Sequence, residues 1–203
     1  MTEDLVTGIP SLESLEQRFD FIKNETLRVN LAIYFRYIIL LLAISEDEKL
    51  DTIKYSVYKD IVIYTASIVE SILEYTIKEY VVVGKAKEDI FGFSWHFCEV
   101  SPINHDCNDF RDAKFCVARK EKKLKWSSRE IDFADINNAA KNAKILDKPL
   151  FDMADPLRKR RNLIHLGSLE KSTNDYFEKK DVQESLNHAH DILSRVESLL
   201  KAL

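Results

Sequence analysis

The amino-acid sequence predicts a mainly α-helical protein that forms a single domain over residues 1–203. Two observations lead to this prediction. Glycine and proline are rare, with 4 of each in 203 residues, whereas all-β proteins need many of them in tight turns. Apolar residues make up 45% of the chain and recur at helical spacing through several long segments. Residues 85–131 lack this periodicity, and they predict a small β-hairpin or irregular insertion.

The charge and the cysteine content indicate a soluble protein of a reducing compartment. The formal net charge of −4 is not that of a general nucleic-acid binder, so a contact with RNA would need a local basic patch. Three cysteines (Cys98, Cys107 and Cys116) and no recognisable secretion signal favour reduced thiols and a cytoplasmic location. The longest apolar run, residues 31–44, is too short to span a bilayer, and no membrane association is expected.

Two long helical segments are expected in the first half of the chain. After Ser11, which can cap a helix, apolar residues recur to residue 44, as one helix or as two with a bend near Asn24. The second part of this segment is apolar on more than one side, which suits a central or dimer-facing helix. The stretch Ser45–Glu48 has the form of a capping box, so a second helix is expected over residues 51–83.

Glu70 lies among apolar and small residues of this second helix. Most glutamates within helices face the solvent, and that is one interpretation of this residue. The other interpretation is a carboxylate that orients a histidine or an arginine of a later helix. The sequence leaves both interpretations open.

The insertion predicts two short strands laid on the helices. The second strand region carries a basic run beside a tryptophan: Arg119, Lys120, Lys122, Lys123, Lys125 and Trp126. This run could guide RNA, with the indole stacking on a base, or it could be an exposed hairpin tip.

The insertion also contains four soft side chains within twelve residues: His96, Cys98, His105 and Cys107. Zinc accepts such ligands, but their spacing differs from that of the usual paired-cysteine knuckle, and buried free cysteines are common. No glycine-rich loop that could cradle a phosphate is present. We therefore expect neither a metal nor a cofactor.

Three further helices are expected after the insertion, over residues 133–145, 149–166 and 182–202. A polar connection separates the last two. Asp181 fits the N-cap of the last helix, which is apolar on one face.

The middle one of these helices contains the stretch best suited to phosphate chemistry. Asp155 fits its N-cap, Pro156 its first turn and Gly167 its end. It holds four consecutive basic residues, then an amide and an imidazole: Arg158, Lys159, Arg160, Arg161, Asn162 and His165. Helical spacing puts all of these except Lys159 and Arg160 on one stripe, and Arg160 points roughly 140° away from His165. Cations near the start of a helix oppose its macrodipole, which favours a functional cluster over a solvated basic face.

The second half of the chain resembles the HEPN superfamily (higher eukaryotes and prokaryotes nucleotide-binding). The sequence ASIVESILEY is similar to the family's apolar helix with an embedded acid, and FADINNAAKNAKIL resembles the short helix before the motif helix. The sequence LRKRRNLIHLG looks like the family signature of an arginine, four to six residues and a histidine. Arg158 and Arg160 both fit this spacing, whereas helical phase favours Arg158 and Arg161, so the motif arginine stays open.

The resemblance implies an up-and-down bundle of four to five helices that forms a homodimer, with two motif helices meeting across a cleft. It also implies a metal-independent endoribonuclease of toxin or phage-defence kind, in which the ribose 2′-OH attacks the adjacent phosphate. Guanidinium groups would stabilise the phosphoryl oxygens, and an imidazole would transfer the proton. The catalytic candidates are Arg158, Arg161, Asn162 and His165, the RNA-binding candidates are Arg160, Lys159, Lys122 and Lys123, and Glu70 is the supporting residue.

Two alternatives to a nuclease stay open at this point. A non-catalytic HEPN module would bind a nucleotide, an RNA or a protein such as a nucleotidyltransferase-type antitoxin. A helical oligomeric scaffold would use the basic helix only to seal an interface.

Overall fold

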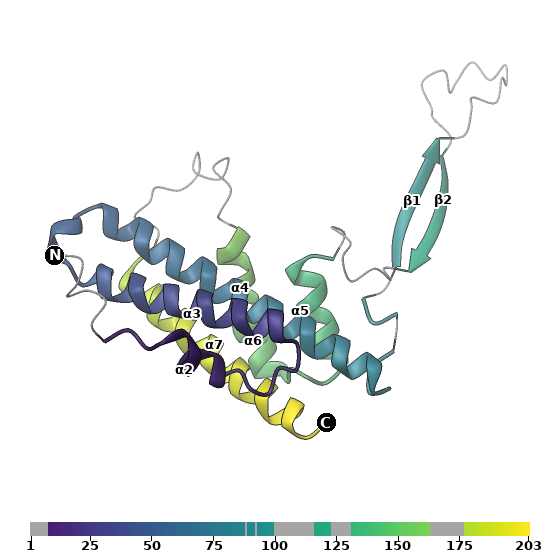
Figure 1. The fold of residues 1–203 in the computed structure, drawn as a ribbon. Coiled ribbons are helices and arrows are strands. Elements are labelled where there is room, and N and C mark those ends of the chain that lie inside the picture. The colour runs from purple at the N-terminus through teal and green to yellow at the C-terminus, as the bar shows by residue number, and fades with distance from the viewer. Residues whose placement is uncertain (1–7, 88, 92, 100–115, 123–130, 163–176) are drawn as a thin grey trace, which may run out of the picture.

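The computed structural model is mainly helical, as predicted, and one long helix, α4 (Ile53–Val82), runs through its centre (Figure 1). The structure describes residues 8–87, 89–91, 93–99, 116–122, 131–162 and 177–203. The other elements are α2 (Leu12–Gln17), α3 (Glu25–Ser45), the 3₁₀ turn η1 (Glu48–Leu50), β1 (Phe93–Glu99), β2 (Cys116–Lys122), α5 (Phe133–Asn142), α6 (Lys148–Arg161) and α7 (Lys179–Lys201).

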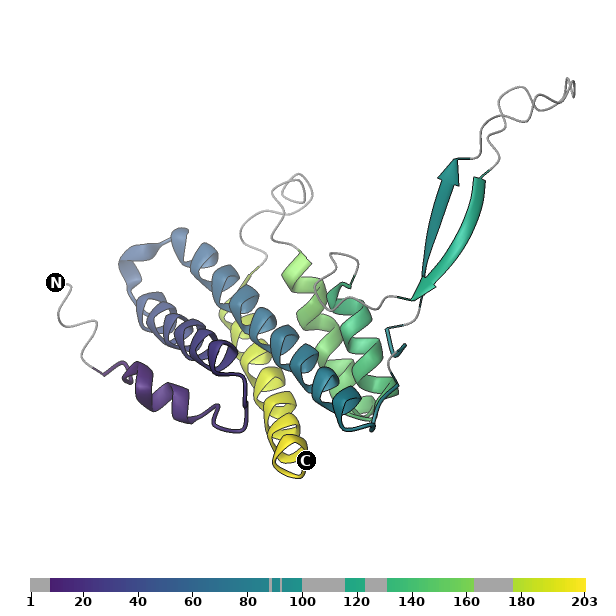
Figure 2. The ribbon, with the colours of Figure 1, turned by 45° about the vertical axis from the view of Figure 1, so that its right-hand side comes forward.

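The helix α4 is buried on several sides because four other helices pack against it. Its 30 residues make it about 45 Å long. Helices α3, α5, α6 and α7 all contact it, and Figure 2 shows them arranged around it. The consecutive residues Ile61, Val62 and Ile63 are all buried, although they point in different directions around the helix. This is the pattern of an internal helix, whereas a surface helix would bury only one stripe.

The apolar segment before α4 forms two helices, which decides between the two alternatives that the sequence left open. Ser11 caps α2, as predicted, by accepting a hydrogen bond from a first-turn backbone N–H. Asn24 caps α3 and accepts from the N–H of Leu27 at 2.9 Å. The chain between the two helices is tied to the core, because the N–H of Lys23 donates to the hydroxyl of Tyr75 on α4.

The stretch Ser45–Glu48 does not form the predicted capping box. The hydroxyl of Ser45 donates to the carbonyl of Leu42 in its own helix, and Asp47 caps η1 instead. The prediction was wrong because a serine in the last turn of a helix can satisfy its hydroxyl on the preceding turn. The helix α4 consequently starts at Ile53, two residues later than predicted.

The insertion contains the predicted β-hairpin, but the prediction that its strands lie on the helices was wrong. The two strands are antiparallel, with Phe93 opposite Lys122 and Glu99 opposite Cys116. Both views show the pair extending away from the helices (Figures 1 and 2). Phe91, just before β1, is buried in the core and joins the base of the hairpin to the helices. A strand pattern predicts pairing, but docking also requires free apolar surface on the helices.

The helix α6 begins earlier than predicted. Asp147 caps it by accepting from a first-turn N–H, and Pro149 occupies the first turn. Asp155 and Pro156 therefore lie inside the helix, and their prediction as its start was wrong. Two Asp–Pro start signals follow each other in this stretch: Asp147 with Pro149 two residues later, and Asp155 with Pro156 directly after it. The structure uses the first one.

The remaining two helices agree with the predicted positions to within three residues. Asp132 caps α5 through a capping box, and the helix ends at Asn142, before the predicted end at residue 145. The helix α7 starts at Lys179, ahead of the predicted N-cap Asp181. Asp181 instead completes a capping box by accepting a hydrogen bond from the N–H of Glu178.

The helix α3 has an apolar face that the described residues cover only in part. Ile33, Tyr34 and Tyr37 are exposed, and the two tyrosine rings contact the ring of Tyr64 on α4. The apolar run of residues 31–44 belongs to a helix of 21 residues, which by length and composition could cross a membrane. Core helices and N-terminal signal sequences meet the same criterion. Exposed aromatic faces of this kind mark interaction surfaces.

The central position of α4 predicts very different costs for the same substitution at two sites along it. Ile72 is fully buried, whereas Ile53 is exposed at the first position of the helix. Ile72→Ala should lower the free energy of unfolding by about 2–5 kcal/mol, because it leaves a cavity in the core. Ile53→Ala should change it by less than about 0.5 kcal/mol. Urea unfolding followed by circular dichroism measures both values, and equal losses would contradict this packing.

Candidate functional site

The four consecutive basic residues form the last turn of α6, not its first. The C-terminal end of a helix carries partial negative charge, so the macrodipole favours cations there. The sequence argument that these cations oppose the dipole was therefore wrong, because it placed the helix start at Asp155. Their clustering alone does not point to a function.

Arg158 and Lys159 both bind a single carboxylate of their own helix. Nε and Nη2 of Arg158 donate to Oδ1 of Asp155 at 2.9 and 2.8 Å, and Nζ of Lys159 lies 2.8 Å from Oδ2. The hydrogen bonds from Lys159 and Arg158 lower the pKa of Asp155 below its ordinary value. The acid that the sequence assigned to the helix cap thus neutralises part of the basic cluster.

Arg160 links α6 to α7 through hydrogen bonds and ion pairs. Its Nη2 donates to Asp181 and to Glu184, each at 2.8 Å, and its Nη1 donates to the hydroxyl of Ser185 at 3.1 Å. The side chain is only 18% exposed. Both terminal nitrogens are occupied, so a phosphate could bind Arg160 only by displacing these partners. The RNA-binding role predicted for this residue therefore competes with its structural contacts.

The partners of Arg160 were not predicted from the sequence. Asp181 and Glu184 lie three positions apart and so share one face of α7. This spacing was the one available signal, but it does not reveal which distant cation the face meets.

Arg161 points to a different helix and forms an ion pair with Glu70. Its Nη2 lies 3.3 Å from Oε2 of Glu70 on α4. The carboxylate side chain is 17% exposed and the arginine side chain is 38% exposed. Of the two interpretations of Glu70, this geometry corresponds to the one in which the carboxylate holds an arginine of a later helix. The guanidinium is more accessible than that of Arg160 and retains further N–H donors.

Burial raises the pKa of Glu70 above its ordinary value, although the nearby Arg161 acts in the opposite direction. Glu74 and Asp132 add to the rise because their negative charges lie close by. The carboxyl group of Glu70 thus has one cationic partner, Arg161, and two acidic neighbours. Groups whose pKa is displaced by burial and by specific charges are typical of functional sites.

The structure describes some of the other predicted site residues and not the rest. Asn162 is the exposed C-cap of α6, next to Arg161. The helix α6 ends at Arg161, so the prediction that it runs to residue 166 and stops at Gly167 was wrong. His165 and Lys123 lie outside the described residues. Lys122 ends β2, opposite Phe93 at the end of the hairpin that lies nearer the helices. The part of the basic run that the structure describes, Arg119 to Lys122, is therefore not at the hairpin tip, which was one of its two interpretations.

The described residues contain no group of three histidine, cysteine or acidic side chains that could hold a metal ion. Of the four candidate zinc ligands, His105 and Cys107 lie outside the described residues, and His96 and Cys98 belong to β1. The prediction of no metal stays a prediction.

Comparison with models of protein families, with curated proteins and with solved structures gives no match to this chain. The residues themselves therefore have to carry the functional argument. Chemically, the end of α6 offers one accessible guanidinium, which pairs with a partly buried carboxylate, and His165 follows it four positions later in the chain.

The contacts of α6 predict that its neighbouring cations contribute unequally to stability. Arg160→Met should lower the free energy of unfolding by about 1.5–3 kcal/mol, because it removes charged hydrogen bonds and leaves a partly buried carboxylate without its partner. Lys159→Ala should cost at most about 1 kcal/mol, since that lysine is largely exposed. Chemical unfolding measures both, and equal effects would show that Arg160 does not fasten the two helices.

The raised pKa of Glu70 predicts that ionisation of this carboxyl group lowers the free energy of unfolding. A carboxyl group that binds its proton more tightly when folded supports folding fully at low pH and loses that contribution as pH rises through its raised pKa. Glu70→Gln removes this dependence, so the stability of the variant relative to the wild type should increase as the pH rises above about 4. Glu13→Gln, at an exposed position of α2, is the control. A constant difference between wild type and Glu70→Gln across this range would contradict the prediction.

Proposed function

We propose that this protein is a metal-independent endoribonuclease of HEPN type, in which Arg161 and His165 act on the phosphate that the neighbouring ribose 2′-OH attacks. The observation that carries the proposal is the ion pair between Arg161 and Glu70. Arg161 is the most exposed of the three arginines in the run, and the ion pair gives the acid embedded in the apolar helix a partner at the motif. A partly buried carboxylate with a raised pKa costs stability, and such costs are typical of functional positions.

The proposed reaction is an internal transfer of the phosphate ester. A base takes the proton of the ribose 2′-OH, the 2′ oxygen forms a bond to phosphorus, and the bond to the 5′ oxygen of the next nucleotide breaks. That leaving oxygen takes up a proton, which gives a 2′,3′-cyclic phosphate and a 5′-hydroxyl. Arg161 stabilises the negative charge that builds on the phosphoryl oxygens, and His165 transfers a proton.

A homodimer completes this site in the proposal. One chain supplies one His165, whereas the reaction needs a base and an acid. Two copies of the end of α6 in one cleft would supply both, with Asn162 beside each arginine to orient the phosphate.

The test is cleavage of short end-labelled RNAs in the presence of EDTA. The wild type should leave 2′,3′-cyclic phosphate ends, and Arg161→Ala and His165→Ala should each slow cleavage at least about 100-fold. Lys148→Ala, which removes an exposed cation at the other end of α6, should change the rate by less than about twofold. A wild type that is inert on several RNAs, or variants that cut as fast as the wild type, would reject the nuclease.

A non-catalytic binding module is the second candidate, and the pairing of the basic run favours it. Each of Arg158, Lys159, Arg160 and Arg161 already contacts a carboxylate. The exposed aromatic face of α3 would then bind a protein partner, since interfaces are enriched in such residues. Association that Tyr37→Asp abolishes, without any cleavage of RNA, would favour this candidate over the nuclease.

A further inference from the structure

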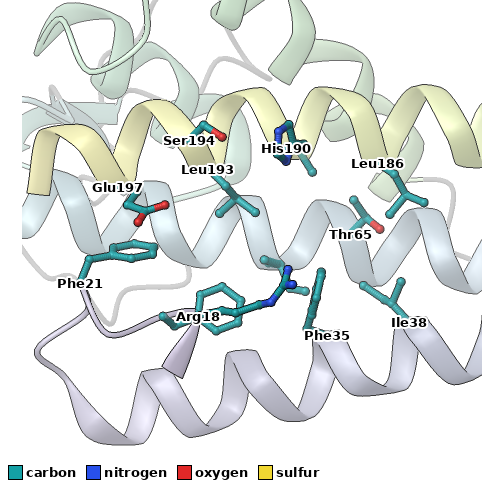
Figure 3. Close-up of a pocket in the computed structure, with 13 residues that line it drawn as sticks. Arg18, Phe21, Phe35, Ile38, Thr65, Leu186, His190, Leu193, Ser194 and Glu197 are labelled. Atoms are coloured by element: carbon teal, nitrogen blue, oxygen red, sulfur yellow. The ribbon is translucent and has the colours of Figure 1, made fainter. Parts of the chain in front are cut away.

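A cavity lies between α2, α3, α4 and α7, on a different side of α4 from Glu70 (Figure 3). Its volume is about 470 Å³, within the range of pockets that hold small organic molecules. This cavity faces α3 and α7, whereas Glu70 faces α6. The cavity is therefore separate from the candidate nuclease site.

The walls of the cavity are mainly apolar. Three aromatic rings line the side formed by α2 and α3, namely Phe19, Phe21 and Phe35. Ile38 and Ile68 are buried and close the floor. Such walls bind the apolar body of a ligand by removing its surface from water.

The floor contains one polar group without a partner, the hydroxyl of Thr65. Other hydroxyls of α4 donate to the carbonyl four residues earlier, as Ser67, Ser71 and Thr76 all do. The Oγ1 of Thr65 makes no hydrogen bond, although the residue is only 2% exposed. Figure 3 shows this side chain between Leu186 and Ile38, which also line the cavity. Buried hydroxyls are normally satisfied, so an unpaired one points to a polar atom of a bound molecule.

The mouth of the cavity carries an available positive charge. Arg18, the C-cap of α2, makes no ion pair with any residue that the structure describes, and its guanidinium lies beside Phe35 at the cavity. Glu197 also lines the mouth, but Lys201 pairs with it at 2.6 Å. His190 adds an exposed imidazole. The mouth therefore favours an anionic group over a cationic one.

We propose that this cavity binds a small amphipathic carboxylate, with its charged group on Arg18, its apolar body against the phenylalanine rings, and a hydroxyl or carbonyl oxygen near its inner end on Thr65. The three contacts define the class of ligand as a carboxylic acid with an apolar chain or ring and a second, internal oxygen.

Calorimetric titration of the full chain tests the carboxylate contact. The probes are straight-chain acids of roughly six to ten carbons and the corresponding alcohols, which match the size of the cavity. The acids should bind at least about tenfold more tightly than the alcohols, in keeping with a charged hydrogen bond. Arg18→Ala should remove this preference, while Arg36→Ala, at an exposed position of α3 outside the cavity, should leave it unchanged.

The hydroxyl of Thr65 is tested with ω-hydroxy derivatives of the same acids. At least one of them should bind several-fold more tightly than its parent acid, and Thr65→Val, which keeps the shape of the side chain, should abolish that gain. Leu193→Trp fills the cavity and should abolish binding of all probes. Thermal unfolding identifies any variant that fails to fold.

Three results would each overturn the proposal. The first is that the wild type binds none of the acids, and the second is that it binds acids and alcohols equally. The third is that binding persists in a folded Leu193→Trp variant, because the probes would then occupy another place. RNA cleavage is measured separately, so failure here leaves the nuclease proposal untouched.

Discussion

The burial of α4 on several sides is the constraint on which the rest of this structure depends. A helix with apolar residues around most of its circumference has to be covered by several neighbours, because each uncovered apolar face costs free energy in water. The helices α3, α5, α6 and α7 provide this cover, although they come from both ends of the chain. The hairpin of β1 and β2 lies between α4 and α5 in the sequence, and it extends away from the helices that cover α4.

Ionic contacts then fix how the end of α6 lies against the core. Arg160 binds α7 and Arg161 binds α4, so two neighbouring residues join three helices. The two contacts differ in kind. Arg160 has several well-placed acceptors and lowers the pKa of Glu184 through its hydrogen bond, as expected of a stabilising pair. Glu70 instead keeps a raised pKa beside Arg161, which means that burial outweighs the attraction.

Two polar side chains of α4, Thr65 and Glu70, are poorly accommodated in the core, and they face different neighbouring helices. Thr65 is directed to the cavity between α3 and α7, and Glu70 is directed to α6. The hydroxyls of Ser67, Ser71 and Thr76 are instead satisfied within the helix itself. A core helix that keeps one unpaired hydroxyl and one destabilised carboxylate gives up stability at both places, and we assign a function to each.

The sequence by itself determined the helical class and the approximate position of each helix, because apolar periodicity and caps such as Ser11 and Asp132 are local properties. It also singled out the basic stretch of α6 and the acid at Glu70. Only the tertiary structure decided which of two Asp–Pro signals starts α6, that Arg160 binds α7, and that Arg161 meets Glu70. These outcomes depend on which distant side chains packing brings together, and residue spacing within one helix carries no information about a partner on another.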